Sequence, residues 1–275
     1  MKHVDYSLAL VWLCLLLAAA SAPSARAAPP HPLPHAPPSG APARAAAAAS
    51  GIALNFDQDT VGAAAAHVEA VIGDWLVSER QGARGLLVDG SRWRSGTPSA
   101  NLADQARRLY GERYAEFLDG VRAFAFFPLA VVQQDPPLGD VRMSVRFLPI
   151  AGRIDQAAGI AFDIKADGSY LGIRANALEE NILYFKVVRG RRSIIDNVRN
   201  TPTATRAWHT LTLTVRGRDL AVELDGTSRF RKQLDAAPRG RVGLWSKADS
   251  QVLFDDFRVE NVESLAAQPG PAPRN

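Results

Sequence analysis

The chain has 275 residues, and its content of 47% hydrophobic and 22% charged residues is that of a globular protein with a sizeable core. The formal net charge of +4 comes from scattered arginines. We expect no nucleic-acid partner, because such a groove needs a basic stripe interleaved with stacking aromatics. Cys14 is the only cysteine and lies in an N-terminal apolar run, which excludes a disulfide-stabilised domain.

The N-terminus has the features of a secretory signal peptide. An apolar run over residues 8–20 follows Lys2 and His3. A small-residue A-x-A site follows at residues 25–27. The run is shorter than the roughly 20 residues that span a bilayer. We therefore expect cleavage after residue 27, no membrane segment after cleavage, and a secreted or periplasmic product.

Two low-complexity segments flank the part of the chain that can fold. Residues 28–50 are mostly Ala, Pro and Ser, and residues 264–275 are similar. Neither segment has enough apolar bulk to pack against a core. We expect a disordered Ala/Pro-rich linker at 28–50, one folded domain at 51–263 and a disordered tail at 264–275.

Within residues 51–263, short stretches alternate apolar and polar residues, which is typical of antiparallel strands with one buried face. We expect strands at 52–56, 75–77, 85–88, 141–147, 158–164, 170–176, 182–188, 209–215, 220–224, 242–245 and 252–259. Turn residues separate them at 81–82, 166–168 and 225–226. The basic residues Arg189, Arg191 and Arg192 surround Gly190, which indicates a solvated hairpin tip.

One segment departs from this rhythm. Apolar residues over 102–118 recur near a period of 3.6, with Arg and Glu between them, and Gly120 follows. This pattern predicts one amphipathic helix lying on the sandwich. The predicted fold is therefore all-β, an antiparallel jelly-roll β-sandwich with one inserted amphipathic helix.

Alternation also predicts which side chains face the core. The inward set is Ile160, Phe162, Ile164, Leu171, Ile173, Ala175, Leu183, Phe185, Val187, Val242 and Leu244. The outward set combines aromatic and polar side chains, namely Tyr170, Tyr184, Trp245, Asp163, Arg174, Asn176, Lys186 and Lys247. Aromatic rings with hydrogen-bonding groups suit a sugar ring, whose C–H face packs on a π-surface. The alternative is that the rings cover the sheet and the charges pair with one another.

Several motifs resemble known families. The segments at 240–259 (GRVGLWSKADSQVLFDDFRV) and at 55–59 resemble the end and the start of concanavalin A-like lectin/glucanase, or laminin-G-like, jelly rolls. More narrowly, GRIDQAAGIAF, YLGIRANALEENILYFKV and AWHTLTLTVRG resemble the bacterial 3-keto-disaccharide hydrolase-like domain family. This resemblance implies hydrolysis of glycosides. Because it centres on Arg153, Asp155 and Gln156, these three residues join the candidate site.

Direct searches for catalytic motifs give little. The E-x-D-x-x-E motif of family 16 glycosidases is absent, as are zinc-ligand spacings and a nucleophile elbow. Asp255 and Asp256 together with Asp57 and Asp59 suggest a structural calcium ion. Capping of backbone amides and pairing with Arg258 or Arg241 is the favoured interpretation, so no cofactor is expected.

The sequence thus predicts an exported, lectin-like β-sandwich that binds a carbohydrate, or a related polar small molecule, in a groove on its concave sheet. One alternative is a glycoside hydrolase with Asp155 or Asp163 as the acid/base. Another is an envelope structural or adhesion module that binds a protein.

Overall fold

The computed structural model describes residues 51–92, 127–137 and 139–263, and its regular elements there are all β-strands. They are β1 (Ile52–Leu54), β2 (Val68–Ile72), β3 (Trp75–Arg80), β4 (Ala83–Asp89), β5 (Leu129–Val132), β6 (Val141–Ala151), β7 (Ala157–Ile164), β8 (Tyr170–Asn176), β9 (Asn181–Val188), β10 (Arg191–Arg199), β11 (His209–Arg216), β12 (Asp219–Leu224), β13 (Thr227–Gln233), β14 (Arg241–Ser246) and β15 (Gln251–Asn261). No helix in this part of the chain is long and apolar enough to cross a membrane.

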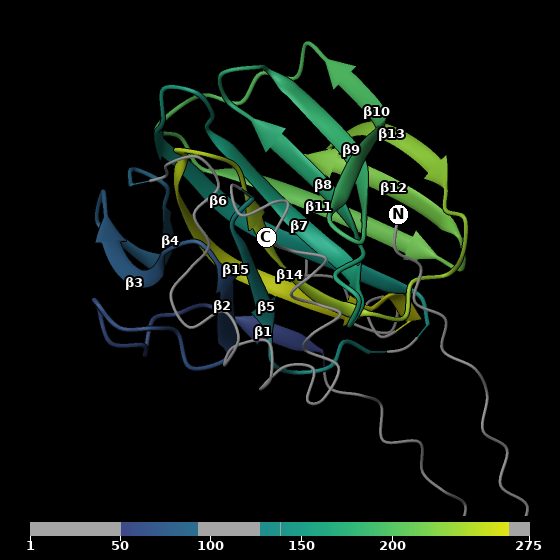
Figure 1. Cartoon of the computed structure of the whole chain (residues 1–275), viewed down its shortest axis with the longest axis horizontal. Helices are drawn as coiled ribbons and strands as arrows, with labels where there is room; N and C mark the ends of the chain where they lie inside the picture. The colour runs from purple at the N-terminus through teal and green to yellow at the C-terminus, as the bar shows by residue number, and fades with distance from the viewer. Residues whose placement is uncertain (1–50, 93–126, 138, 264–275) are drawn as a thin grey trace, which may run out of the picture. The chain divides into compact units, whose positions relative to one another are not determined.

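The strands form two antiparallel sheets that pack as a sandwich (Figure 1). The eight-stranded sheet has the order β13-β12-β11-β6-β15-β4-β3, and β1 adds to β15. The seven-stranded sheet has the order β10-β9-β8-β7-β14-β5-β2. Neighbours far apart in sequence, such as β6 with β15 and β7 with β14, give the crossing connections of a jelly roll.

The long strand β15 joins the two ends of the folded chain. Its first half pairs with β4, where Val252 lies opposite Val88. Its second half pairs with β1, where Val259 lies opposite Ile52. A bulge between these halves, with a positive φ at Asp256, lets one strand serve both partners.

The space between the sheets is filled by one large apolar cluster. Its fully buried members include Phe147, Phe254, Ile160, Ile173 and Leu244, which come from both sheets in alternate positions along their strands. Because such burial removes apolar surface from water, this layer is the main source of stability in a domain without disulfides.

The other face of the seven-stranded sheet is also buried. A second apolar cluster there includes Tyr170, Leu183, Phe185, Val187 and Trp245. Each of these side chains has little or no exposed surface. The seven-stranded sheet is therefore packed on both sides, whereas the sequence analysis assumed one solvated face.

The predicted strands are confirmed, with boundaries shifted by up to four residues. Four strands were not predicted, namely β2, β5, β10 and β13. The predicted turns at 166–168 and 225–226 are confirmed, and Asp225 and Gly226 both have positive φ. The signal peptide, the linker, the helix over 102–118 and the tail lie outside the described residues.

The side assignment of β9 was wrong. Register pairs Ile173 with Tyr184, so Tyr184 lies in the core between the sheets. Leu183, Phe185 and Val187, predicted to point inward, lie on the opposite face. The cause is that β9 is largely buried on both faces and mostly apolar, so apolar and polar residues do not alternate clearly along it.

The end of β7 differs from expectation for another reason. Asp163 has a positive φ, and the pairing of β7 with β14 shifts register between Arg241 and Gly243. This irregularity moves Ile164, predicted to point inward, to the cluster that contains Trp245.

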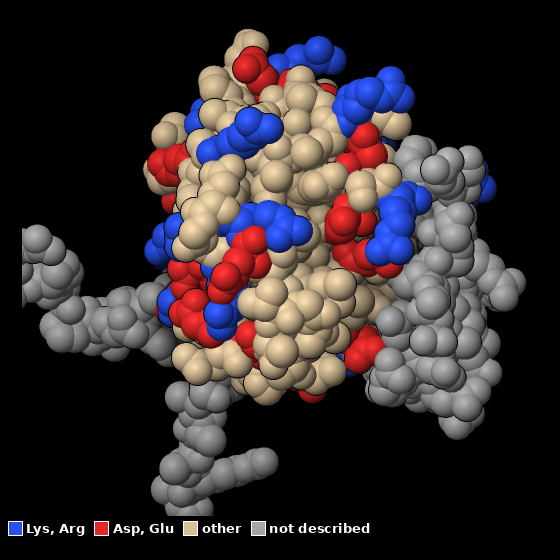
Figure 2. All heavy atoms as spheres, turned by 90° about the vertical axis from the view of Figure 1, so that its left-hand side faces the viewer, with Lys and Arg blue, Asp and Glu red and all other residues tan. Residues whose placement is uncertain are grey.

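Charged side chains are mixed over the surface. Figure 2 shows one side of the domain, where basic and acidic residues lie beside one another. Several form ion pairs, such as Arg84 with Glu79 at 2.7 Å and Arg146 with Asp256 at 3.2 Å. On this side, the described residues therefore present alternating charges and not a broad basic surface.

We expect Phe254→Ala to destabilise the domain by about 3–5 kcal/mol, because it removes a fully buried ring that packs on Trp75 and leaves a cavity. Urea unfolding followed by circular dichroism measures the change. Leu76→Ala, at a strand position 46% exposed, is the control and should change stability by about 0.5 kcal/mol or less. Similar losses for both variants would contradict the assigned core.

Candidate functional site

One end of the seven-stranded sheet gathers polar side chains from four strands. Strand register brings them together, because Ala157 lies opposite Asn176, Asn176 opposite Asn181, and Ala158 opposite Ser246. We call the group the polar cluster. It consists of Asp155 before β7, Arg174 and Asn176 on β8, Glu179 in the β8–β9 turn, Asn181 on β9, and Lys247 after β14.

One half of the polar cluster is centred on Arg174. Its guanidinium is 1% exposed and donates to Glu179 Oε2 at 2.5 Å and to Asn181 Oδ1. Asn181 Nδ2 also donates to Glu179 Oε2 at 3.0 Å. Arg174 Nε, although buried, has no hydrogen-bond partner. Glu179 keeps 39% of its side chain exposed, so this half reaches the surface through its carboxylate.

The other half is centred on Asp155, which has no exposed surface. Its Oδ1 accepts hydrogen bonds from Asn176 Nδ2 at 2.8 Å and from Lys247 Nζ at 3.1 Å. Its Oδ2 lies 2.9 Å from the same ammonium as an ion pair. Lys247 also lies 3.9 Å from Glu179 Oε1, and 21% of its side chain is exposed. One lysine therefore links both carboxylates.

The two carboxylates have opposite pKa shifts. Burial raises the pKa of Asp155, although the contacts with Lys247 oppose this effect. The pKa of Glu179 is lowered, because Arg174, Asn181 and Lys247 outweigh a burial effect that acts in the opposite direction. Environments that separate two neighbouring carboxyls in this way are frequent at functional sites, and also in structural ion-pair networks.

The loop before β7 is held in place by Asp249. Its carboxylate accepts backbone N–H groups from Arg153, Ile154 and Asp155 at distances of 2.7–3.1 Å. Burial of Asp249 opposes ionisation, but these amides lower its pKa overall. The clamp fixes the backbone of Asp155, which therefore reaches Lys247 without searching alternative loop conformations.

Aromatic side chains lie beside the polar cluster on the same sheet face. Trp245 Nε1 donates to Tyr170 Oη at 3.1 Å, and the Trp245 ring lies 4.8 Å from Phe185 and 5.3 Å from Phe127. The guanidinium of Arg192 on β10 lies 4.6 Å from the Phe127 ring centroid. These rings stack on one another.

The space beside the glycines of this face is filled by other atoms of the protein. A Cβ at Gly172 would approach the Phe185 ring to 2.3 Å, and one at Gly159 would approach Arg174 Cβ to 2.8 Å. The space beside these two glycines is therefore taken by neighbouring side chains of the same sheet and is not open to a ligand.

The structure brings together most of the predicted site residues. Asp155 contacts Asn176 and Lys247, and Arg174 is linked to Lys247 through Glu179. Trp245 is on the same sheet face and donates a hydrogen bond to Tyr170. Tyr170 and Trp245 are on the predicted face but are buried, so they offer no open stacking surface.

Two other predicted site residues, Gln156 and Arg153, form contacts that hold the loop before β7 in place. Gln156 is nearly buried, and its amide donates to Gly152 O at 3.2 Å and accepts from Thr205 at 2.6 Å. Arg153 is exposed, and its backbone is part of the Asp249 clamp.

Three predicted site residues lie apart from the polar cluster. Tyr184 is in the core between the sheets, and Lys186 shares that face and pairs with Asp235 at 3.9 Å. Asp163 lies at the other end of β7, where its Oδ1 accepts the amides of Arg239 and Gly240. Its Oδ2 pairs with Lys165 at 3.2 Å, and these contacts indicate a structural role.

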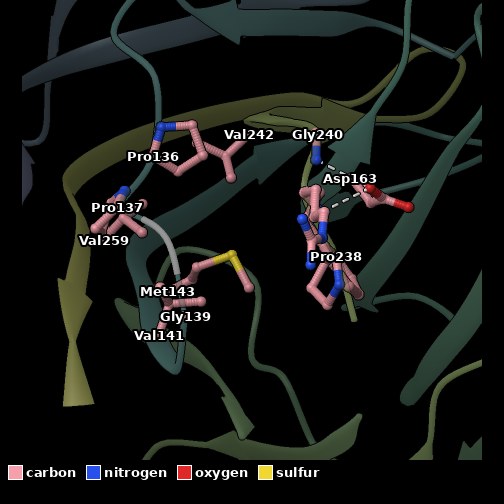
Figure 3. A pocket seen from close by; sticks show the side chains of 12 residues that line it. Pro136, Pro137, Gly139, Val141, Met143, Asp163, Pro238, Gly240, Val242 and Val259 are labelled. Carbon is pink, nitrogen blue, oxygen red and sulfur yellow. Dashed lines mark hydrogen bonds between the residues drawn. The ribbon is translucent and has the colours of Figure 1, made fainter. Parts of the chain in front are cut away.

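Asp163 lines a small cavity between the ends of the two sheets (Figure 3). The other lining residues include Pro136, Met143, Pro238 and Val242. The cavity measures about 30 Å³. Ligand pockets are typically about 300 Å³ or larger, so this space suits a water molecule and not a sugar ring.

The sequence analysis missed Glu179, Asn181, Arg192 and Asp249. Glu179 lies in the turn between β8 and β9, where strand alternation does not predict the direction of a side chain. The pairing of Asn176 with Asn181 across that turn is the signal that identifies it. Arg192, predicted to lie in a solvated tip, is opposite Val187 and half-buried.

The acidic pair on β15 is paired with arginines. Arg146 reaches Asp255 at 3.5 Å and Asp256 at 3.2 Å, and Arg258 reaches Asp256 at 3.2 Å. No group of three or more His, Cys, Asp or Glu side chains within the described ranges is arranged to hold a metal ion.

Comparison with known proteins identifies the fold. No family model and no curated protein matches the sequence. Among solved structures, the carbohydrate binding module CBM66 from Bacillus subtilis is 14% identical with a TM-score of 0.50, and the match covers 71% of this chain and 96% of that one. This chain therefore has a jelly-roll β-sandwich fold.

Two further solved structures match with TM-scores below 0.5. A galectin-like protein of unknown function from Bacillus subtilis is 13% identical, with a TM-score of 0.41, over 49% of this chain and 77% of that one. A β-glucanase from Bacillus licheniformis is 12% identical, with a TM-score of 0.37, over 49% and 71%. The narrower resemblance to 3-keto-disaccharide hydrolase-like domains stays a prediction.

We expect Asp249→Ala to destabilise the protein by about 2–4 kcal/mol at neutral pH, because three amides lose a charged acceptor. The native pKa of Asp249 is lowered, so its contribution is complete above the ordinary value of 3.8 and is lost as pH falls through the native pKa. Urea unfolding of both proteins across acidic pH measures the difference. Asp235→Ala removes an exposed carboxylate and should have little effect. A wild-type advantage that grew on acidification would contradict the clamp.

Proposed function

We propose that this protein binds carbohydrate at the polar cluster. The observation that carries the proposal is the convergence of carboxylate, amide, guanidinium and ammonium groups at one sheet end, where Glu179 and Lys247 remain accessible. These groups supply both donors and acceptors, which the hydroxyl groups of a sugar require.

The exposed members of the cluster have hydrogen-bonding capacity to spare. Glu179 accepts Arg174 and Asn181 through Oε2, while its Oε1 has Lys247 only at 3.9 Å, beyond hydrogen-bonding distance. Lys247 has three donors, and Asp155 offers two oxygens to them. An acceptor and a donor are thus left for a ligand at adjacent positions.

Apolar side chains flank these groups. The backbone N–H of Ala177 donates to Gln156 O at 3.1 Å, so the loop before β7 runs beside the β8–β9 turn. Ile154 on the loop and Leu178 on the turn are both exposed. They offer an aliphatic surface for the C–H face of a sugar ring, in place of the aromatic rings that the sequence analysis proposed. The likeness of the fold to a carbohydrate-binding module is consistent with this arrangement.

A glycan array followed by titration calorimetry tests the proposal. We expect wild-type binding to weaken about 10-fold or more in Lys247→Ala and in Glu179→Gln, because each loses a charge-assisted hydrogen bond. Lys165→Ala, at the opposite end of β7, is the matched control and should bind as wild type. The proposal is wrong if no glycan binds, or if the cluster variants retain full affinity.

A second candidate function is glycoside hydrolysis. Asp155, with a raised pKa, is suited to be the acid, and Glu179, with a lowered pKa, the ionised carboxylate. Both lie near the ammonium of Lys247, at 2.9 and 3.9 Å, so the two carboxylates are neighbours in the site. Binding remains the favoured function, because Asp155 is fully buried behind Lys247.

Turnover assays separate the two functions. A hydrolase should release product from a 3-keto-glycoside or an ordinary glycoside, and Asp155→Asn should lower that rate about 100-fold or more while binding persists. Absence of product from substrates that demonstrably bind would exclude hydrolysis of those substrates and leave the binding function in place.

A further inference from the structure

Not every cation near the polar cluster is paired with a carboxylate. Arg174 contacts Glu179 and Lys247 contacts Asp155, whereas Arg192, on the same sheet face, contacts neither carboxylate. A positive charge that is partly removed from water without a partner is unfavourable, and an anion from outside would neutralise it.

Arg192 is the cation without a carboxylate contact. It lies opposite Val187 and faces the same side as Tyr170 and Phe185. Its guanidinium lies 4.6 Å from the ring centroid of Phe127 and 5.7 Å from that of Phe185, and its buried Nη1 has no hydrogen-bond partner. Burial lowers its pKa, and Tyr170, Asp155 and Glu179 oppose that shift from a distance.

Arg174 adds a second unused donor. Its terminal nitrogens are taken by Glu179 and Asn181, but its buried Nε has no hydrogen-bond partner. The same sheet face therefore carries two guanidinium N–H groups whose hydrogen bonds are not made. A guanidinium presents its donors in a planar fork, which matches the two oxygens of a carboxylate.

We propose that the polar cluster selects acidic sugars, and that Arg192 directs this selection toward the carboxylate of a uronic acid unit. The inference rests on the proposed carbohydrate binding and names its ligand class. A uronic acid differs from the corresponding neutral sugar only at C6, where a carboxylate replaces a hydroxymethyl group. The hydroxymethyl group carries no charge, so a neutral sugar leaves the positive charge of Arg192 without a partner.

The test uses pairs of oligosaccharides that differ only at C6. Cello-oligosaccharides and their C6-carboxylate counterparts form one pair, and galactose- and mannose-based pairs cover other ring configurations. We expect the wild-type protein to bind the carboxylate member of a pair about 10-fold or more tightly, with a preference that decreases as salt is raised. The comparison needs no mutation, so it does not depend on the folding of a variant.

Two variants then assign the preference. Arg192→Gln should bind both members of the pair equally, whereas Arg189→Gln, at the exposed tip of the same hairpin, should retain the preference. Circular dichroism and thermal unfolding show whether each variant is folded.

Equal wild-type binding of both pair members overturns this inference and leaves carbohydrate binding intact. Binding of no member of any pair overturns both. A preference that survives in folded Arg192→Gln overturns the role of Arg192.

Discussion

The seven-stranded sheet must be packed on both faces, and this constraint determines where a site can lie. Ile160 and Ile173 fill the space between the sheets, while Trp245 and Phe185 are buried on the opposite face. Where both faces of the sheet are packed, there is no room for a ligand along the strands. At the strand ends, the polar cluster of Asp155, Asn176 and Lys247 reaches solvent through Lys247.

The fold was largely predictable because most strands alternate in the ordinary way. β8 was predicted with its observed limits, and the pairing of β1 with the end of β15 follows the resemblance to jelly rolls. β10 and β13 were missed because they are edge strands with mostly exposed, charged residues and no apolar rhythm. β5 was missed for the opposite reason, since its four residues are buried on both sides.

The candidate site was only partly predictable. Of the members that lie on strands, Arg174 and Asn176 follow from alternation, whereas Asn181 at the start of β9 was missed. Asp155 and Lys247 flank predicted strands. The partners that complete the ion pairs, Glu179 and Asp249, lie in a turn and in a connection, where no periodicity constrains the direction of a side chain. Alternation along a strand indicates which face a side chain lies on, but not whether that face is buried. Trp245 was therefore assigned to the correct face and yet expected to be exposed to solvent.

The connection between β14 and β15 passes from one sheet of the sandwich to the other and carries Lys247, Asp249 and Ser250 within four positions. Besides the Asp249 clamp, Ser250 Oγ accepts the backbone N–H of Ala157 at 3.0 Å and donates to Lys247 O at 2.6 Å. An inserted residue in this connection would disturb the hydrogen bonds of Lys247, Asp249 and Ser250 together. A fusion or an epitope tag placed at the exposed turn of Gln81 and Gly82 would leave these contacts in place, so the turns of the domain differ in how well they tolerate insertions.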